Sequence, residues 1–288
     1  MKVGKLLSYA ILAVGAAFFI FPIVVVVTNS IMSSFEVFNR YSREITPANA
    51  LAIHSTIHFV EMSIIPRQVT LRQYAQLFLE RPVYLLMFLN SVKLTVPIVI
   101  GQVMIATPAA YVFEYSKVKG KEIIFLSYIV IMLLPMQVTL VPNFIAANMI
   151  GLQDSPWAII LPAIFSPFGV FLIRQFIKGM PYEYIEAAKM DGASNSIIFA
   201  RIILPLIKPA VSALVILSFI EHWNIVDQAV IFIKNIYDEP LSVYLSTIIS
   251  EDTGMVFATS CFYMFPTILV FLFGQEYMVE GIQLSGIK

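Results

Sequence analysis

The chain has 288 residues, of which 59% are hydrophobic and only 12% are charged. Soluble domains carry roughly 45–50% apolar and about 25% charged residues. This composition excludes an ordinary water-facing surface and predicts an integral membrane protein covered by lipid. The 18 basic and 18 acidic residues cancel, so nothing in the charge indicates nucleic-acid binding. The single cysteine, Cys261, can form neither an intrachain disulfide nor a thiolate metal cage.

Six apolar stretches are long enough to cross a bilayer, which takes about 20 mostly apolar residues. In chain order they are residues 6–28, 83–113, 123–147, 157–177, 202–233 and 256–277. The first follows Lys2 and Lys5 as a signal peptide would. Its apolar run is longer than a signal's core and no small-x-small site follows it, so we predict a retained anchor. We therefore predict an all-α membrane protein of about six transmembrane helices, with residues 1–288 forming a single transmembrane domain.

Basic residues in the short loops predict the orientation. They gather at residues 2–5, 117–121 and 174–208, whereas residues 149–156 have none and residues 234–254 have one. Both termini are therefore expected in the cytoplasm. This orientation makes residues 32–82 a long extracytoplasmic loop, residues 180–193 a cytoplasmic helix and residues 278–288 a cytoplasmic tail.

The segment 180–193 predicts a short helix outside the bilayer. Pro181 suits the first position of a helix, Glu183 complements the helix dipole in the first turn, and Gly192 is a good C-terminal stop. Its middle carries Ala187 and Ala188, whose small side chains allow another surface to approach closely. We favour docking into a groove of a cytoplasmic partner. An amphipathic helix resting on lipid headgroups is the alternative.

The same segment resembles a known signature. Glu186-Ala-Ala188, three residues, Gly192, nine residues, then Ile202-Ile-Leu-Pro205 is similar to the E-A-A-x3-G-x9-I-x-L-P motif of ABC importer permeases. Every fixed position matches. Phe171-Leu-Ile-Arg174 and Trp223-Asn224 are similar to the carbohydrate-importing branch, the maltose and multiple-sugar type. The resemblance covers essentially all of the chain beyond the first loop.

The resemblance implies the type I ABC importer permease fold in a bacterial cytoplasmic membrane. The short helix would be a coupling helix, seated in a cleft of an ATP-hydrolysing subunit and transmitting its closure through Glu186, Ala187, Ala188, Asp191 and Gly192. The implied partners are a second permease in a heterodimer, two ABC ATPase subunits and an extracytoplasmic solute-binding protein. The implied cargo is a carbohydrate, expected to be an oligosaccharide, moved by alternating access. This chain would bind no cofactor, with ATP and Mg²⁺ held by the ATPase subunits.

Charges within the predicted spans are costly and usually face protein or water. The candidates for such a role are Lys93, Glu221 and Asp227, and we hypothesise that Lys93 pairs with one of the two carboxylates. Lys93 and the length of residues 32–82 also depart from the family. The extra length either contacts a binding protein, enlarges the outer vestibule or is a tolerated insertion. Polar and aromatic side chains at depth are candidate sugar contacts, with interhelical hydrogen bonding as the alternative: Asn90, Gln137, Asn143, Trp223 and Asn224.

Other chemistries lack a matching set of residues. The chain has no G-x-x-x-x-G-K-[ST] loop for ATP, and neither a G-x-S-x-G nor an H-E-x-x-H motif. We therefore expect no enzyme activity of its own. His54, His58 and Glu61 have only a weak zinc-like spacing, and no metal site is expected. Two rival functions remain, a permease for a non-sugar solute and an ion-coupled secondary transporter.

Overall fold

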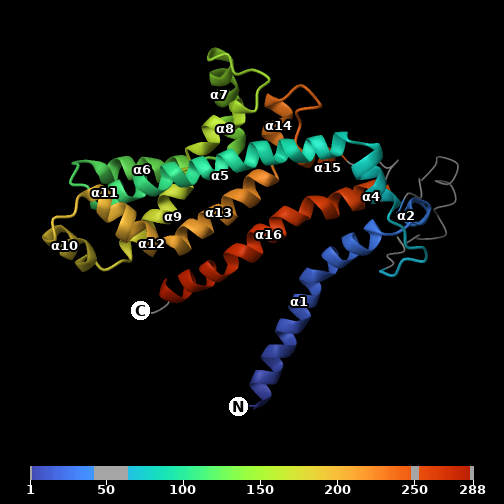
Figure 1. Ribbon diagram of the computed structural model, residues 1–288, viewed down its shortest axis with the longest axis horizontal. Helices are drawn as coiled ribbons and strands as arrows, with labels where there is room; N and C mark the ends of the chain where they lie inside the picture. Colours follow the sequence, from blue (N-terminus) through green and yellow to red (C-terminus); the bar gives the residue numbers. More distant parts are fainter. Residues whose placement is uncertain (1, 42–63, 248–252, 286–288) are drawn as a thin grey trace. The chain divides into compact units, whose positions relative to one another are not determined.

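The computed structural model describes residues 2–41, 64–247 and 253–285 (Figure 1). The chain divides into two compact units. Unit 1 comprises Met1–Leu86 with Tyr244–Phe265, and unit 2 comprises Met87–Val243 with Pro266–Lys288. All the regular structure in the described ranges is helical, apart from one isolated bridge between Met32 and Val69. The predicted all-α class is confirmed.

The described helices provide four apolar stretches long enough to cross a membrane, and six if each of two bent helix pairs counts as one span. Four spans are single apolar stretches: α1 (Lys2–Ser30), α5 (Val83–Tyr115), Trp157–Lys178 and α16 (Thr253–Ser285). Trp157–Lys178 consists of α8 (Trp157–Ile164) and α9 (Pro167–Lys178). The other two are helix pairs: α6 (Lys121–Met132) with α7 (Met136–Met149), bent by 103°, and Asn195–Leu206 with α13 (Lys208–Trp223), bent by 71°.

The two bends lie in the third and fifth predicted spans. Pro135 lies in an extended conformation immediately before α7, and Pro209 lies in the first turn of α13. Proline lacks the backbone N–H that would continue a helix, and its ring clashes with the preceding turn. The fifth stretch is interrupted a second time, because α13 ends at Trp223 and α14 spans Asp227–Phe232.

Unit 1 gathers the two described ends of the long first loop. Besides α1 it contains α2 (Ser34–Tyr41), α4 (Arg72–Ala75) and the π-helix η1 (Gln76–Glu80). The Glu36 carboxylate accepts hydrogen bonds from the backbone N–H groups of Arg67 (3.0 Å) and Gln68 (3.1 Å), and it pairs with Arg40 at 2.6 Å. Burial opposes ionisation, but these donors and the guanidinium outweigh it and lower the pKa of Glu36. Glu36 therefore fastens α2 to the segment that returns from the loop.

Unit 2 is built along α5, which lies beside α6, α9 and α13 (Figure 1). Between α9 and α13 the chain forms α10 (Glu183–Met190), α11 (Asn195–Ile198), the π-helix η2 (Phe199–Ile203) and α12 (Leu204–Leu206), and α15 spans Leu241–Ser246. At one end of α5, Ala106 and Ala110 join a buried group that we call the α10 cluster. Its other members are Phe125, Val170, Ile173, Ile177, Ile185, Ala188, Ile198, Ile203, Ile207, Ala210 and Leu214.

Toward the other end, Leu94 and Ile98 of α5 join a second buried group, the α14 cluster. Its other members are Ala147, Ala158, Ile159, Ile160, Ile225, Ala229, Phe232, Ile233 and Val243. Small residues let the helices of unit 2 approach closely, as is typical of membrane bundles. A β-carbon added at Gly169 of α9 would lie 3.1 Å from the Ala106 β-carbon and 3.2 Å from Leu214. Two apolar clusters therefore stabilise unit 2, and each of them packs against a different part of α5.

Candidate functional site

Helix α10 lies within the segment predicted to couple the bundle to a partner. It spans Glu183–Met190, about 12 Å of helix. It begins two residues later than the sequence predicts, because Tyr182 is the N-cap and Pro181 precedes it. Figure 1 shows α10 at one end of unit 2, beyond the ends of α5 and α9.

The C-terminus of α10 has the geometry of a Schellman cap. The N–H of Ala193 donates to the Ala188 carbonyl and the N–H of Gly192 donates to the Lys189 carbonyl, both at 3.0 Å. Gly192 takes a φ of +79°, in the left-handed region that glycine adopts most readily. The predicted stop at Gly192 is confirmed. Apart from its two neighbours in the chain, none of the described residues lies within 4 Å of the position that a Gly192 β-carbon would occupy, so the space beside it is open.

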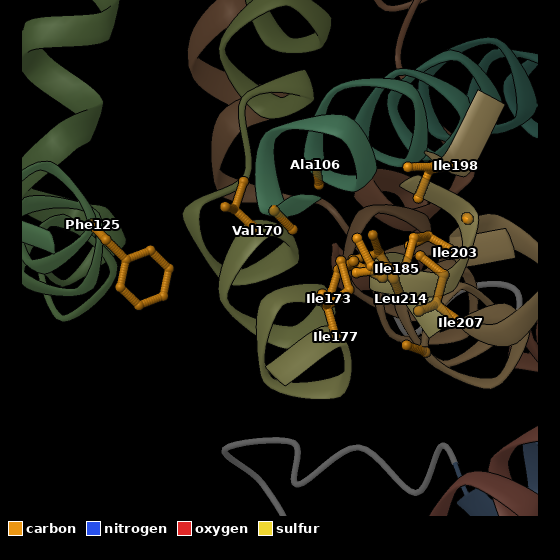
Figure 2. Close-up of a cluster of buried hydrophobic side chains, with 13 residues drawn as sticks. Ala106, Phe125, Val170, Ile173, Ile177, Ile185, Ile198, Ile203, Ile207 and Leu214 are labelled. Carbon is orange, nitrogen blue, oxygen red and sulfur yellow. The ribbon is translucent and has the colours of Figure 1, made fainter. Parts of the chain in front are cut away.

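The two faces of α10 have different surroundings. Ile185 and Ala188 are 1% and 8% exposed and pack into the α10 cluster, where Ile185 lies near Ile173 and Ile203 (Figure 2). The opposite face is open to solvent in this chain. Four of the predicted coupling residues lie on the exposed side: Glu186, Ala187, Asp191 and Gly192. Ala188 is buried in this chain and packs against the bundle.

An ion cluster beside α10 was missed by the sequence reasoning. Arg174 of α9 contacts Glu114 of α5 through Nε (3.0 Å) and Glu122 of α6 through Nη2 (2.7 Å). Its guanidinium carbon also lies 4.0 Å from the centroid of the Phe125 ring. Arg174 is only 7% exposed, so these contacts compensate a buried charge and join three helices. The sequence did contain a signal for this cluster, because Arg174 and the two glutamates lie near the ends of consecutive predicted spans.

Two tyrosines of α5 connect that helix to the chain on both sides of α10. The Tyr115 hydroxyl donates to the Ile177 carbonyl, and the Tyr111 hydroxyl donates to the Asn195 carbonyl, both at 3.4 Å. The Tyr115 ring centroid also lies 5.9 Å from that of Tyr182, at the start of α10. The position of α10 is therefore set by α5 and α9 together.

A second candidate site surrounds the interruption between α13 and α14. Carbonyls freed where α13 ends accept hydrogen bonds from side chains: the His222 carbonyl from Thr95 at 3.2 Å, and the Ile225 carbonyl from Ser242. Irregular backbone at membrane depth is tolerated where it is satisfied in this way or lines a cavity. Beside it lies a cavity of about 240 Å³. Its lining is Met136, Glu221, His222, Asn224, Ile225, Val226, Asp227 and Gln228.

The structure places the five predicted pathway residues in different surroundings. Of these, Asn224 lines the cavity, together with the predicted intramembrane charges Glu221 and Asp227. Gln137 is exposed and adjoins the cavity residue Met136 in the chain, while Asn143 lines a separate hollow of about 260 Å³.

The other two pathway candidates serve packing. Trp223 is 1% exposed and its ring stacks with Phe219 at 5.2 Å between centroids. Asn90 is 5% exposed and its amide donates to the Tyr237 carbonyl at 2.7 Å and the Glu239 carbonyl at 3.3 Å. In this conformation neither side chain is open to a sugar.

The expected ion pair of Lys93 is wrong for this structure. Lys93 Nζ donates to the Asn90 side-chain oxygen at 3.5 Å, and among the described residues no ion pair joins it to Glu221 or Asp227. All three charged side chains are exposed in the isolated chain, so none needs an internal partner. The His54, His58 and Glu61 set lies outside the described residues. Within those residues, no group of three or more metal-ligating side chains is placed to hold a metal ion.

Comparison with known proteins gives these two sites a family context. Residues 102–277, which include α10 and the cavity, match the family described as binding-protein-dependent transport system inner membrane component. The arabinooligosaccharides transport system permease protein AraQ of Bacillus subtilis is 32% identical over 80% of this chain and 83% of its own length. Its counterpart in Halalkalibacterium halodurans is 28% identical over 100% of this chain and 99% of its own.

A solved structure has the same fold. In the crystal structure of a bacterial ABC transporter involved in the import of the acidic polysaccharide alginate, one chain superposes with a TM-score of 0.75. The match covers 96% of this chain and 97% of that one, at 21% identity. The apolar spans, the short capped helix at the end of the bundle and the match over residues 102–277 agree with one another. This multi-pass chain thus belongs to the family of inner membrane components of binding-protein-dependent transport systems, the permease subunits of ABC importers.

Proposed function

We propose that this chain is the transmembrane subunit of an ATP-driven importer of an oligosaccharide. The observation that carries the proposal is α10, a short capped helix anchored by Ile185 and Ala188 that leaves Glu186, Ala187 and Gly192 open for a partner. The names of the relatives support the cargo, since two are arabinooligosaccharide permeases and the solved neighbour belongs to an importer of a polysaccharide.

In this proposal an ATPase subunit holds α10 and moves it when the ATPase dimer closes. Because Ile185 is fully packed against α9 and η2, a displacement of α10 must move those elements with it. The ATPase subunits supply the ATP and Mg²⁺ sites, and this chain supplies no cofactor. Placing α10 on the cytoplasmic side puts both chain termini there as well, and it directs the loop 32–82 toward the binding protein.

The second permease is proposed from the exposed charges. Lys93, Glu221 and Asp227 lie in or next to the apolar spans and are exposed in the isolated chain. Exposure of such charges to lipid costs at least about 2.5 kcal/mol each. A second permease in a heterodimer, with an aqueous path between the two subunits, removes that cost. The cavity beside α14 would then open to the two sides of the membrane in turn.

Gentle solubilisation from the native membrane tests the proposal. We expect an ATPase subunit and a second permease to copurify, and we expect vesicles containing the complex to take up arabinotriose only with ATP and the binding protein. Uptake driven by an ion gradient, by a chain that emerges alone under mild conditions, would replace the proposal with a secondary transporter. An intact complex that takes up a non-sugar solute and no oligosaccharide would correct the cargo alone.

A further inference from the structure

The cavity beside the α13–α14 interruption has a distinctive chemistry. We infer that it selects neutral, hydroxyl-rich sugars and disfavours acidic ones such as uronate oligosaccharides; this inference rests on the proposed function. Its lining offers hydrogen-bond acceptors and two carboxylates. Each of the polar side chains involved comes from the segment 221–228, where the helix is interrupted.

The carboxylates are the first acceptors. Glu221 and Asp227 flank the interruption, line the cavity and are exposed in the isolated chain. An ionised carboxylate only accepts hydrogen bonds, and its two oxygens can receive several donors. A sugar hydroxyl can donate to them. A uronate carboxylate has no proton to donate and carries the same charge as the lining.

His222 and Asn224 add acceptors of their own. His222 is 8% exposed, and its Nδ1 lies 2.8 Å from the Ser218 carbonyl. A carbonyl accepts, so Nδ1 carries the hydrogen, and in the tautomer with a single N–H this leaves Nε2 as an acceptor. Asn224 donates one N–H to the Ile220 carbonyl at 2.8 Å, which leaves its side-chain oxygen to accept and its second N–H to donate. Gln228 likewise offers both kinds of group, so acceptors predominate in the polar lining because of the two carboxylates and His222.

No cation offsets the two carboxylates within the lining. Glu221 and Asp227 are the only charged side chains among the described residues that line this cavity. Lys234 lines a different hollow with Asp154, and Lys93 contacts Asn90. A cleft lined by one sign of charge focuses its field and repels ions of that sign. The cavity therefore differs from what the acidic cargo of the solved neighbour would require.

The potential of the cavity can be measured without depending on what the binding protein delivers. In the assembled importer, Cys261→Ser removes the native thiol and Asn224→Cys introduces one at the cavity wall. Two methanethiosulfonate reagents then serve as probes, one with a trimethylammonium group and one with a sulfonate. The rate at which each reagent modifies the introduced thiol is divided by its rate with a free thiol in solution, which corrects for the different reactivities of the two reagents. We expect the corrected cation-to-anion ratio to exceed about 10.

Two matched double variants test whether the carboxylates of the cavity cause the high cation-to-anion ratio. Glu221→Gln with Asp227→Asn should bring the ratio to about 1. Asp238→Asn with Glu239→Gln removes the same charge from a nearby segment that does not line the cavity, and the ratio should stay high. A ratio near 1 in the parent, or one unchanged by the first pair, overturns the inference.

Uptake separates this inference from the proposed function. Arabinotriose supplied with the binding protein should slow the cationic reagent, because the sugar occupies the cavity. If arabinotriose uptake is intact and the reagent is not slowed, the cavity lies off the pathway and the inference is overturned while the proposed function stands. A high ratio that falls with the first pair, in an importer that moves no oligosaccharide, supports the acidic cavity and overturns the proposed cargo.

Discussion

The α10 end of unit 2 and the α13–α14 interruption are stabilised in different ways. At the α10 end, aliphatic side chains such as Ile173, Ile177 and Ile185 interlock with almost no exposure. At the interruption, side chains such as Thr95 and Ser242 donate to carbonyls that the broken helix leaves free, beside a polar cavity. A close-packed interlock transmits displacement because it is nearly incompressible. An interrupted helix held by a few hydrogen bonds can change shape, so the first region suits coupling and the second suits passage of cargo.

The largest expected effect compares two helix caps that have the same hydrogen-bond pattern, one after α10 and one after α7. Gly151, after α7, repeats the Schellman bonds of Gly192: its N–H donates to Asn148, the Leu152 N–H donates to Ala147, and its φ is +74°. Both glycines have open space where a β-carbon would lie. Gly192→Asp should abolish ATP-dependent uptake, because the side chain obstructs the partner that α10 docks against. Gly151→Asp imposes the same backbone strain, about 1–2 kcal/mol, and should keep most uptake.

Uptake in right-side-out vesicles that contain ATP, with the binding protein and sugar supplied outside, and quantification of the protein in the membrane check this pair. Equal loss in both variants at equal protein level would show that the cap geometry, and not a docked partner, limits transport.

The interlock itself is tested by Ile185→Ala. Removing a fully buried isoleucine should cost about 3 kcal/mol and loosen α10 from the bundle. Amide hydrogen exchange within α10 should then accelerate on the order of 100-fold if it occurs by local opening. Tyr184→Ala changes a neighbour that is 54% exposed and should leave exchange nearly unchanged. Similar exchange in both variants would refute the anchoring role of Ile185.

Substitutions of Arg174 test whether the ion cluster stabilises the α10 end of unit 2. Arg174→Met should lower the free energy of unfolding by about 2 kcal/mol, since Glu114 loses its partner. Arg174→Lys keeps the charge but loses the planar contacts, and about half the loss is expected. Glu122→Gln should matter less than Glu114→Gln, because the Glu122 side chain is 64% exposed and that of Glu114 is 20%. Thermal unfolding of the detergent-solubilised complex would show this order, and a reversed order would contradict it.

The smallest effect concerns the hydrogen bonds at the interruption. Thr95→Val keeps the shape of the side chain but removes the donor to the His222 carbonyl, and should cost about 1 kcal/mol. Thr139→Val removes a bond within α7 and should cost less than about 0.5 kcal/mol. Denaturant titration distinguishes the two. Equal costs would mean that Thr95 does not support the interruption.

The sequence predicts the spans well because an apolar run long enough to cross a bilayer is rare in a water-soluble fold. The stop at Gly192 is equally local, since a left-handed residue at a helix end favours glycine. The bend at Pro135 is harder, because prolines also occur inside unbroken spans, as Pro97 does in α5. Local sequence patterns therefore predict where helices lie better than they predict the angles between consecutive helices.

Contacts between distant residues were not predictable from one sequence. Arg174 and its carboxylate partners lie 60 and 52 positions apart, and Thr95 meets the carbonyl of a residue 127 positions away. Charge alone suggested a Lys93 ion pair that the structure does not form. The burial of Ala188 depends on how α10 is rotated against α9, which composition does not determine. Residues facing a partner and residues facing the bundle therefore separate only in the structure.

The most direct test of the central claim, that the exposed face of α10 docks against an ATPase subunit, uses two adjacent alanines. In a Cys261→Ser background, Ala187→Cys places a thiol on the exposed face and Ala188→Cys places one on the buried face. Each thiol is labelled with a photoactivatable maleimide in the assembled complex, and cross-linked products are identified by mass spectrometry. We predict that the thiol at position 187 captures an ATPase subunit and that the thiol at position 188 does not. No ATPase adduct from position 187, in a complex that still transports, would contradict the assignment of α10 as the coupling helix.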